Sequence, residues 1–266
     1  MKKLYQQLFI SILMAWIFIP ASVAQAGRDS EVYLTLRGGI GYGLYRDLGA
    51  SPLTYCGPEL MPAIGADIRL PEWRYNARLQ VIAGTYGYTL KTLSLNMFGG
   101  EALLSFEALH RCLSTPRWQL WAGSVLDDCF DIRYNGLLGN SCTGIGNYLR
   151  LHVTGLAEFT LHRWTFHGQL SFAPVAWVLR PGYAYIANYD RDIANPVANT
   201  FEQYGTYFAG ACALATELGA TLHFGGGNWL SLSYCWHYLT SRTAEACPWR
   251  FDRAAHALTF TLGMKL

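Results

Sequence analysis

Four side chains of this sequence combine a possible general base with acids that could orient it. His237 is an imidazole near the end of one alternating apolar run, and Asp127 and Asp128 stand together at the end of another. Asp190 lies in the longest stretch that has no clear periodic pattern. A histidine beside carboxylates can act as a general base on water, so these four residues are candidates for a hydrolytic site. In the alternative interpretation the acids are solvated loop residues, and no catalytic residue is assigned.

Other chemistry is not indicated by residue spacing. The seven cysteines form no C-x-x-C pair, and no two histidines stand four apart on a plausible helix. The G-x-S-x-G pattern of many serine hydrolases is also missing from the sequence. The sequence therefore predicts neither a metal site nor a cofactor.

The elements that carry these residues are β-strands, because large apolar side chains recur at every second position. Ten such runs follow the first 26 residues, and they are mostly the 9–11 residues that a tilted transmembrane strand needs. The runs cover 32–40, 60–70, 74–81, 103–108, 118–122, 149–159, 164–172, 214–222, 230–238 and 258–266.

The connections between these runs alternate between short and long. Four are short turns, at 70–73, 114–118, 161–164 and 225–229, and five are longer, at about 43–58, 85–98, 127–147, 173–208 and 240–253. An even number of strands with short turns on one side is typical of a bacterial outer-membrane barrel. The predicted fold is all-β, a closed antiparallel transmembrane β-barrel of ten strands. Twelve strands would result if the loop 173–208 held another hairpin.

Composition and targeting signals agree with this fold. Residues 1–26 have two lysines, an apolar run and an A-x-A site, the pattern of a secretory signal peptide, so 27–266 is predicted to be a single domain. Without the two lysines the formal net charge falls from +2 to 0, which gives no case for nucleic acid. Charged residues make up only 14% of the chain, against about 25% in ordinary soluble domains.

A tryptophan follows each of the short turns. Because an indole ring prefers the boundary between membrane and water, these four residues predict an interfacial belt at the periplasmic side. They are Trp73, Trp118, Trp164 and Trp229, of which Trp229 is one residue out of phase with its strand.

If the apolar set faces lipid, the alternate set lines the lumen. That set includes Arg37, Asp67, Arg69, Arg74, Arg78, Glu107, Arg150, His152, Glu158 and Glu217, together with His167 and His237. Ten strands enclose a narrow space, and unpaired buried charge is costly, so we expect the charges to pair and fill most of it. The alternative is a narrow pore for small solutes.

The cysteines allow two disulfides in an oxidising compartment. Cys129 and Cys142 lie in one predicted loop. Cys56 and Cys247 lie in the first and fifth long loops, which become neighbours only if the last strand pairs with the first. A bridge between them is a hypothesis that would support closure of the barrel.

Two family resemblances accompany these patterns. The stretch Ser51-Pro52-Leu53-Thr54-Tyr55-Cys56-Gly57, with Trp236–His237 and His256–Leu258, resembles an uncharacterised Bacteroidetes outer-membrane β-barrel family, a domain of unknown function that brings no activity. In strand number and residue type the chain is also similar to omptin proteases, although no omptin motif matches.

The role that these observations favour is non-enzymatic: a structural or ligand-binding barrel of the cell outer membrane with a mostly plugged, charged lumen. An omptin-like rim hydrolase acting on peptide or lipid is the alternative, beside the narrow pore. The expected partners are outer-membrane lipid, lipopolysaccharide and, during biogenesis, the barrel-assembly machinery.

Overall fold

The computed structural model describes residues 30–48, 53–90, 93–135, 143–174, 176–181, 204–242 and 250–266. The predicted signal peptide, Cys142, Asp190 and Cys247 lie outside these ranges. Within them the regular elements are all β-strands, and no helix is long and apolar enough to cross a membrane. The strands are β1 (Glu31–Asp47), β2 (Thr54–Leu60), β3 (Ala63–Arg69), β4 (Trp73–Leu90), β5 (Leu93–Ser114), β6 (Trp118–Tyr134), β7 (Thr143–Leu161), β8 (Trp164–Ala173), β9 (Ala176–Pro181), β10 (Tyr204–His223), β11 (Trp229–Arg242) and β12 (Phe251–Lys265).

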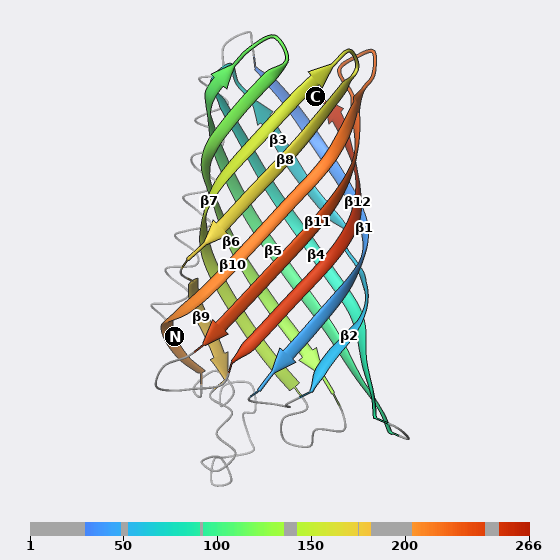
Figure 1. The fold of residues 1–266 in the computed structure, drawn as a ribbon, viewed down its shortest axis with the longest axis vertical. Helices are drawn as coiled ribbons and strands as arrows, with labels where there is room; N and C mark the ends of the chain where they lie inside the picture. The colour runs from blue at the N-terminus through green and yellow to red at the C-terminus, as the bar shows by residue number, and fades with distance from the viewer. Residues whose placement is uncertain are drawn as a thin grey trace.

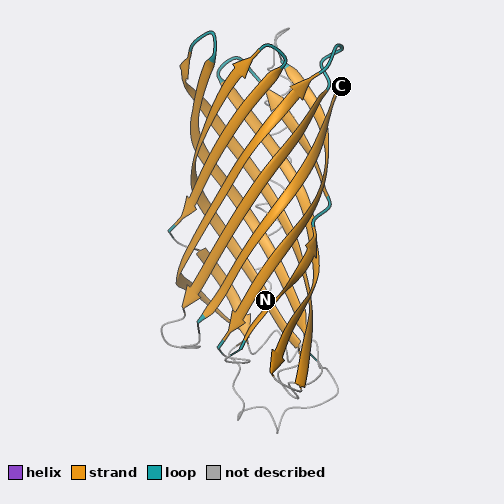
Figure 2. Ribbon diagram, turned by 45° about the vertical axis from the view of Figure 1, so that its right-hand side comes forward, coloured by secondary structure: helices purple, strands orange, loops and turns teal. Residues whose placement is uncertain are grey.

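These elements form one closed antiparallel ring (Figures 1 and 2). The short segments β2 and β3 follow one another in a single position of the ring, because each is hydrogen-bonded to β1 and β4. In the same way β8 and β9 share one position between β7 and β10. The ring closes where β12 pairs with β1, from Tyr33 opposite Lys265 to Asp47 opposite Phe251. The predicted closed barrel of ten strands is confirmed, and two of its strands are each broken once. Residues 182–203, where an extra hairpin was considered, lie outside the described residues.

Proline accounts for both breaks. Pro62 follows Met61 between β2 and β3, and Pro174 follows Ala173 at the end of β8. Proline has no N–H to donate to the sheet, so the ladder is interrupted at each. At the first break the amide of Met61 donates to the carbonyl of Gly39 at 2.9 Å, which keeps the chain in the wall.

The strands are longer than predicted. β5 has 22 residues, β10 has 20 and β7 has 19, whereas the sequence periodicity predicted 9–11. At about 3.3 Å per residue a strand of that length is far longer than a bilayer requires, even when tilted. The extra residues lie at the end of the long connections, the lower end in Figures 1 and 2, so the barrel continues beyond the membrane there. Most of the predicted loops 85–98 and 127–147 are therefore strand.

The two faces of the wall differ as the alternation predicts. Large apolar side chains lie exposed on the outside, for example Ile40 at 64%, Val153 at 70% and Leu218 at 60%. Polar side chains such as Asp67 and Thr154 are buried inside. An apolar exterior around a polar interior is the arrangement of a barrel that sits in lipid.

Three of the four turn tryptophans lie on the outer wall. Trp73, Trp118 and Trp164 each begin a strand after a short turn and are 41%, 49% and 45% exposed. The turn before Trp118 is fixed by the hydroxyl of Thr115, which accepts a hydrogen bond from the Trp118 amide at 2.9 Å.

Trp229 lies inside the barrel, so its prediction as a belt residue was wrong. It is 6% exposed, packs over Gly263 and has its ring 6.2 Å from the ring of Tyr33. The reason is strand parity: β11 begins at Trp229, and the outward residues of β11 are the even-numbered ones, such as Leu232. The same odd register that turns Ser231 and Ser233 inward turns Trp229 inward.

The two predicted disulfides are not present between described residues, because Cys56 and Cys129 are free thiols. Both cysteines lie in strands instead of loops: Cys129 is an inward, buried residue of β6, and Cys56 lies in β2 within 3.1 Å of the Tyr42 hydroxyl. Their predicted partners, Cys142 and Cys247, lie outside the described residues. Among the described residues the barrel is closed by the β1–β12 ladder.

Candidate functional site in the barrel interior

The barrel interior contains a cavity of about 470 Å³. Its lining runs from Trp229 and His223 near the short turns to Tyr148 and Phe251 in the opposite half. All of the charges that the alternation placed in the lumen line this cavity: Arg37, Asp67, Arg69, Arg74, Arg78, Glu107, Arg150, His152, Glu158 and Glu217.

At the short-turn end an ion-pair network crosses the lumen. Arg74 of β4 contacts Asp67 of β3 at 3.1 Å and Glu158 of β7 at 3.0 Å. Arg69 also pairs with Asp67, at 2.9 Å, and the indole N–H of Trp121 donates to Glu158 at 2.9 Å. Because β4 and β7 are separated by β5 and β6, the Arg74–Glu158 pair joins distant parts of the wall.

A second group lies farther along the lumen. Nη2 of Arg37, from β1, reaches Oε2 of Glu217, on β10, at 3.0 Å, and also donates to the Thr259 hydroxyl at 2.7 Å. His167 lies 3.7 Å from the other oxygen of Glu217. Beside Glu217, the amide of Gln169 on the neighbouring strand β8 donates across the lumen to Glu107 of β5.

Asp127 has its own partners between β6 and β7. Its carboxylate accepts from Nε of Arg150 at 2.6 Å and contacts Nε2 of His152 at 2.9 Å. Both oxygens of this buried acid are therefore engaged with neighbours on the adjacent strand.

A further buried cluster was missed by the sequence reasoning. Arg253 of β12 pairs with Glu101 of β5 and, at 3.2 Å, with Glu59 of β2. The hydroxyl of Tyr45 donates to Glu101, and that of Tyr86 donates to Glu59 at 2.7 Å. The signal was present in the sequence. Glu101 continues the inward alternation of Glu107, and Arg253 continues that of Thr259, beyond the ends of the predicted strands.

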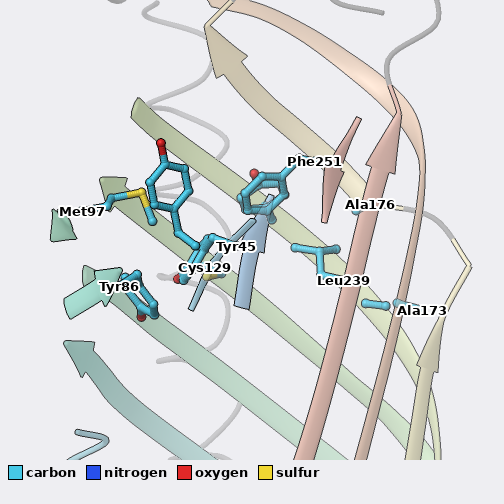
Figure 3. Packing of buried hydrophobic residues seen from close by; sticks show 11 residues of the cluster. Tyr45, Tyr86, Met97, Cys129, Ala173, Ala176, Leu239 and Phe251 are labelled. Atoms are coloured by element: carbon cyan, nitrogen blue, oxygen red, sulfur yellow. The ribbon is translucent and has the colours of Figure 1, made fainter. Parts of the chain in front are cut away.

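Between this cluster and the long connections the interior becomes aromatic. Eleven residues form a buried layer, which we call the aromatic layer: Tyr45, Tyr55, Tyr86, Met97, Cys129, Tyr148, Ala173, Ala176, Ala213, Leu239 and Phe251. Figure 3 shows these side chains pointing inward from the surrounding strands. Tyr148 and Phe251 stack with ring centroids 5.7 Å apart, and the guanidinium of Arg133 lies 4.7 Å from the Phe251 ring. Arg133 also pairs with Asp47 across the lumen at 2.9 Å.

The candidate hydrolytic residues are not assembled into one site. The charged groups near His237 are Arg253, Arg78 and Arg37, with Glu217 as the carboxylate among them. Asp127 is engaged by Arg150 and His152, as described above. Asp128, on the opposite face of β6, accepts from the amide of Asn147. Asp190 lies outside the described residues, so within the described part of the chain no His237–aspartate pair forms.

Arg78 differs from the other lumen arginines of the described part. Its Nε is shielded from solvent and has no hydrogen-bond partner, and no ion pair from its guanidinium is found among the described residues. Nor do the described His, Cys, Asp and Glu side chains form any cluster of three that could hold a metal ion.

Comparison with known proteins gives fold likenesses only. No family model and no curated protein matches the chain. The outer membrane protease OmpT from Escherichia coli is 8% identical, with a TM-score of 0.47, over 89% of this chain and 96% of that chain. The translocator domain of autotransporter NalP from Neisseria meningitidis is 8% identical, with a TM-score of 0.39, over 97% and 96%. The β domain of the Bordetella autotransporter BrkA is 10% identical, with a TM-score of 0.37, over 88% and 98%.

The fold and its two faces define the class of protein. All backbone groups of a closed ring can pair within the wall, which is the condition for a sheet to enter lipid. The chain is an outer-membrane β-barrel. The resemblance of 51–57 to a Bacteroidetes-type family stays a prediction.

Proposed function

We propose that this barrel has a structural or ligand-binding role in the outer membrane, with a lumen mostly closed by its own side chains. The observation that carries the proposal is the aromatic layer. Every one of the ten positions in the ring contributes at least one residue to it, from Tyr45 on β1 to Phe251 on β12. A layer to which all sides of the wall contribute supports a lumen that is closed at that level. The rings of Tyr45, Tyr86, Tyr148 and Phe251 are each only 1% exposed.

The charges between the layer and the short turns support the same role. Arg74 with Glu158 and Arg37 with Glu217 connect strands that are not neighbours, so their side chains extend across the lumen. Paired charges satisfy one another, and an open water channel would not require such pairing. The exposed face is therefore where we place ligand contact.

A narrow conduit for small solutes is the second candidate. It is favoured by the cavity of about 470 Å³ and by Arg78, whose guanidinium lines that cavity without an ion-pair partner among the described residues. An unpaired guanidinium in a confined space is the type of group that selects anions.

Flux through liposomes distinguishes the two. Refolded protein is inserted into liposomes, and passage of chloride and glucose is compared with that of empty liposomes. We expect no difference for the native chain. The double variant Tyr148→Ala with Phe251→Ala should open the aromatic layer and raise flux.

The matched control is Phe130→Ala with Tyr134→Ala, which removes two rings from the outer face of β6 near the same level, where they are 43% and 52% exposed. This variant should not conduct. Native protein that passes chloride as readily as the double interior variant would contradict a closed lumen and support the conduit. Only protein with heat-modifiable gel migration, which indicates a folded barrel, is compared.

The surroundings of the barrel follow from the same proposal. Trp73, Trp118 and Trp164 form an interfacial belt at the periplasmic side, for which their position after the short turns and their exposure are the support. Lipid, lipopolysaccharide and the barrel-assembly machinery remain the proposed partners.

A further inference from the structure

A second hollow lies on the outer wall, away from the lumen. It is a groove of about 870 Å³ that crosses strands from β11 to β5. Outward side chains line it, among them Tyr42, Leu60, Ala83, Phe98, Tyr234 and His256. Volumes of this size are typical of sites for small organic ligands.

The groove follows an irregular part of the wall. β2 pairs with β4 through only three opposed residues, Cys56 with Gly87, Glu59 with Gly84 and Leu60 with Ala83, whereas β3 pairs with β4 along all of its residues. Pro58, which lines the groove, and Pro62 donate no N–H to the ladder. The backbones nevertheless approach closely: a Cβ added at Gly57 would lie 1.9 Å from the Thr85 carbonyl. The floor of the groove is made of backbone and small residues such as Ala83 and Gly84. The larger rings of Tyr42, Phe98 and Tyr234 flank it.

Polar groups stand along this groove beside exposed apolar side chains such as Ile40 and Leu258. The hydroxyl of Tyr234 is hydrogen-bonded to Nδ1 of His256, and the hydroxyl of Tyr42 lies 3.1 Å from the sulfur of Cys56. An ionisable side chain that faces lipid is costly to keep there and is a candidate for a functional role. His256, whose parity on β12 turns it outward, packs beside the rings of Tyr234 and Trp236, and its Nε2 has no hydrogen-bond partner among the described residues, so this nitrogen can contact a ligand.

We infer that this groove is a binding site for one acyl chain of a membrane lipid, with the lipid's ester oxygens near His256 and Tyr42. The exposed neighbours Ile40, Leu60 and Leu258 are 64%, 61% and 53% exposed and place the groove within the lipid-facing wall. A peptide could add to the sheet only at a free edge, and a closed ring has none. The chemistry that remains for an apolar hollow in the lipid-facing wall, with hydrogen-bonding groups at one side, is that of a lipid tail.

The test is photolabelling in a bilayer of defined composition. Folded protein is placed in vesicles of phosphatidylethanolamine and phosphatidylglycerol that contain a trace of phospholipid with a diazirine on its acyl chain. After irradiation the labelled peptides are mapped by mass spectrometry. We expect residues of β1, β2 and β4 around the groove to be labelled several-fold more than outward residues of β6 and β7.

The deciding variant is Ala83→Trp, which places an indole in the groove and should remove most of the excess labelling. Its control is Ala77→Trp, on the lipid-facing register of the same strand but outside the groove. Thr85→Leu, which fills the groove with a smaller side chain, substitutes for Ala83→Trp if that variant does not fold. Equal labelling around the barrel, or excess labelling that survives in the filled variant, would overturn the inference.

Lipid binding in the groove does not depend on the state of the lumen. Flux reports on the interior and labelling reports on the outer wall, so a conducting native barrel would leave the groove unaffected. His256→Phe adds a second readout: it should lower labelling by a probe with its diazirine close to the glycerol backbone more than labelling by a tail-end probe.

Discussion

The two halves of the barrel interior differ in aromatic content: both hold ion pairs, and the half near the long connections also holds stacked rings. Near the short turns the lumen holds ion pairs around Arg74 and Arg37, with Asp67 buried between two guanidinium groups. In the opposite half Tyr148 and Phe251 stack in a layer that resembles the core of a soluble protein. Buried charges are stabilised in a lumen by their partners, whereas rings fill it by volume. The two halves should therefore respond differently to the same kind of substitution.

The largest effect is expected from removing one charge in the half near the short turns. Arg74→Leu leaves Glu158 without its guanidinium and Asp67 with Arg69 alone, so we expect a loss of about 3–5 kcal/mol in the free energy of unfolding. Urea unfolding in lipid vesicles, followed by tryptophan fluorescence, measures it. The control Arg117→Leu changes an exposed arginine in a short turn and should stay within about 0.5 kcal/mol of the native protein. An Arg74→Leu protein as stable as this control would show that the ion pairs contribute no net stability.

A smaller effect is expected from an apolar substitution in the aromatic layer. Phe251→Leu keeps most of the volume, so the free energy of unfolding should fall by only about 1 kcal/mol. Part of that loss comes from the contact between the Arg133 guanidinium and the Phe251 ring. The same unfolding measurement applies, with Phe260→Leu on the exposed face of β12 as the control. A loss as large as that of Arg74→Leu would mean that the two halves do not differ in the way proposed.

The half near the short turns was easier to predict from sequence than the other. There the outer residues are regularly apolar because lipid surrounds them, so the parity of Arg37, Asp67 and Glu158 was clear. Beyond the bilayer that requirement ends, and the periodic signal weakens before the strands do. Glu101 and Arg253 were missed for this reason, and Cys129 was placed in a loop although it lies in β6.

Contacts across the lumen could not be predicted at all. Which arginine meets which carboxylate depends on the stagger of ten strands, which no single run of residues contains. The pairing of Arg37 with Glu217 joins residues 180 positions apart. The same holds for the outer groove, which depends on a three-residue ladder between β2 and β4, because most of β2 lay in the predicted loop 43–58.

The smallest expected effect is a change in tryptophan fluorescence. It compares Trp118, on the outer wall, with Trp229, inside the barrel. Brominated lipid quenches an indole that it can touch, so Trp118→Phe should remove part of the quenchable fluorescence. Trp229→Phe should remove only fluorescence that the lipid does not quench, because Trp229 lies against Gly263 and beside Arg69 inside the barrel. Both variants keep an aromatic ring, which limits changes in folding. Equal loss of quenchable signal in the two variants would place Trp229 on the lipid face and contradict the inward register of β11.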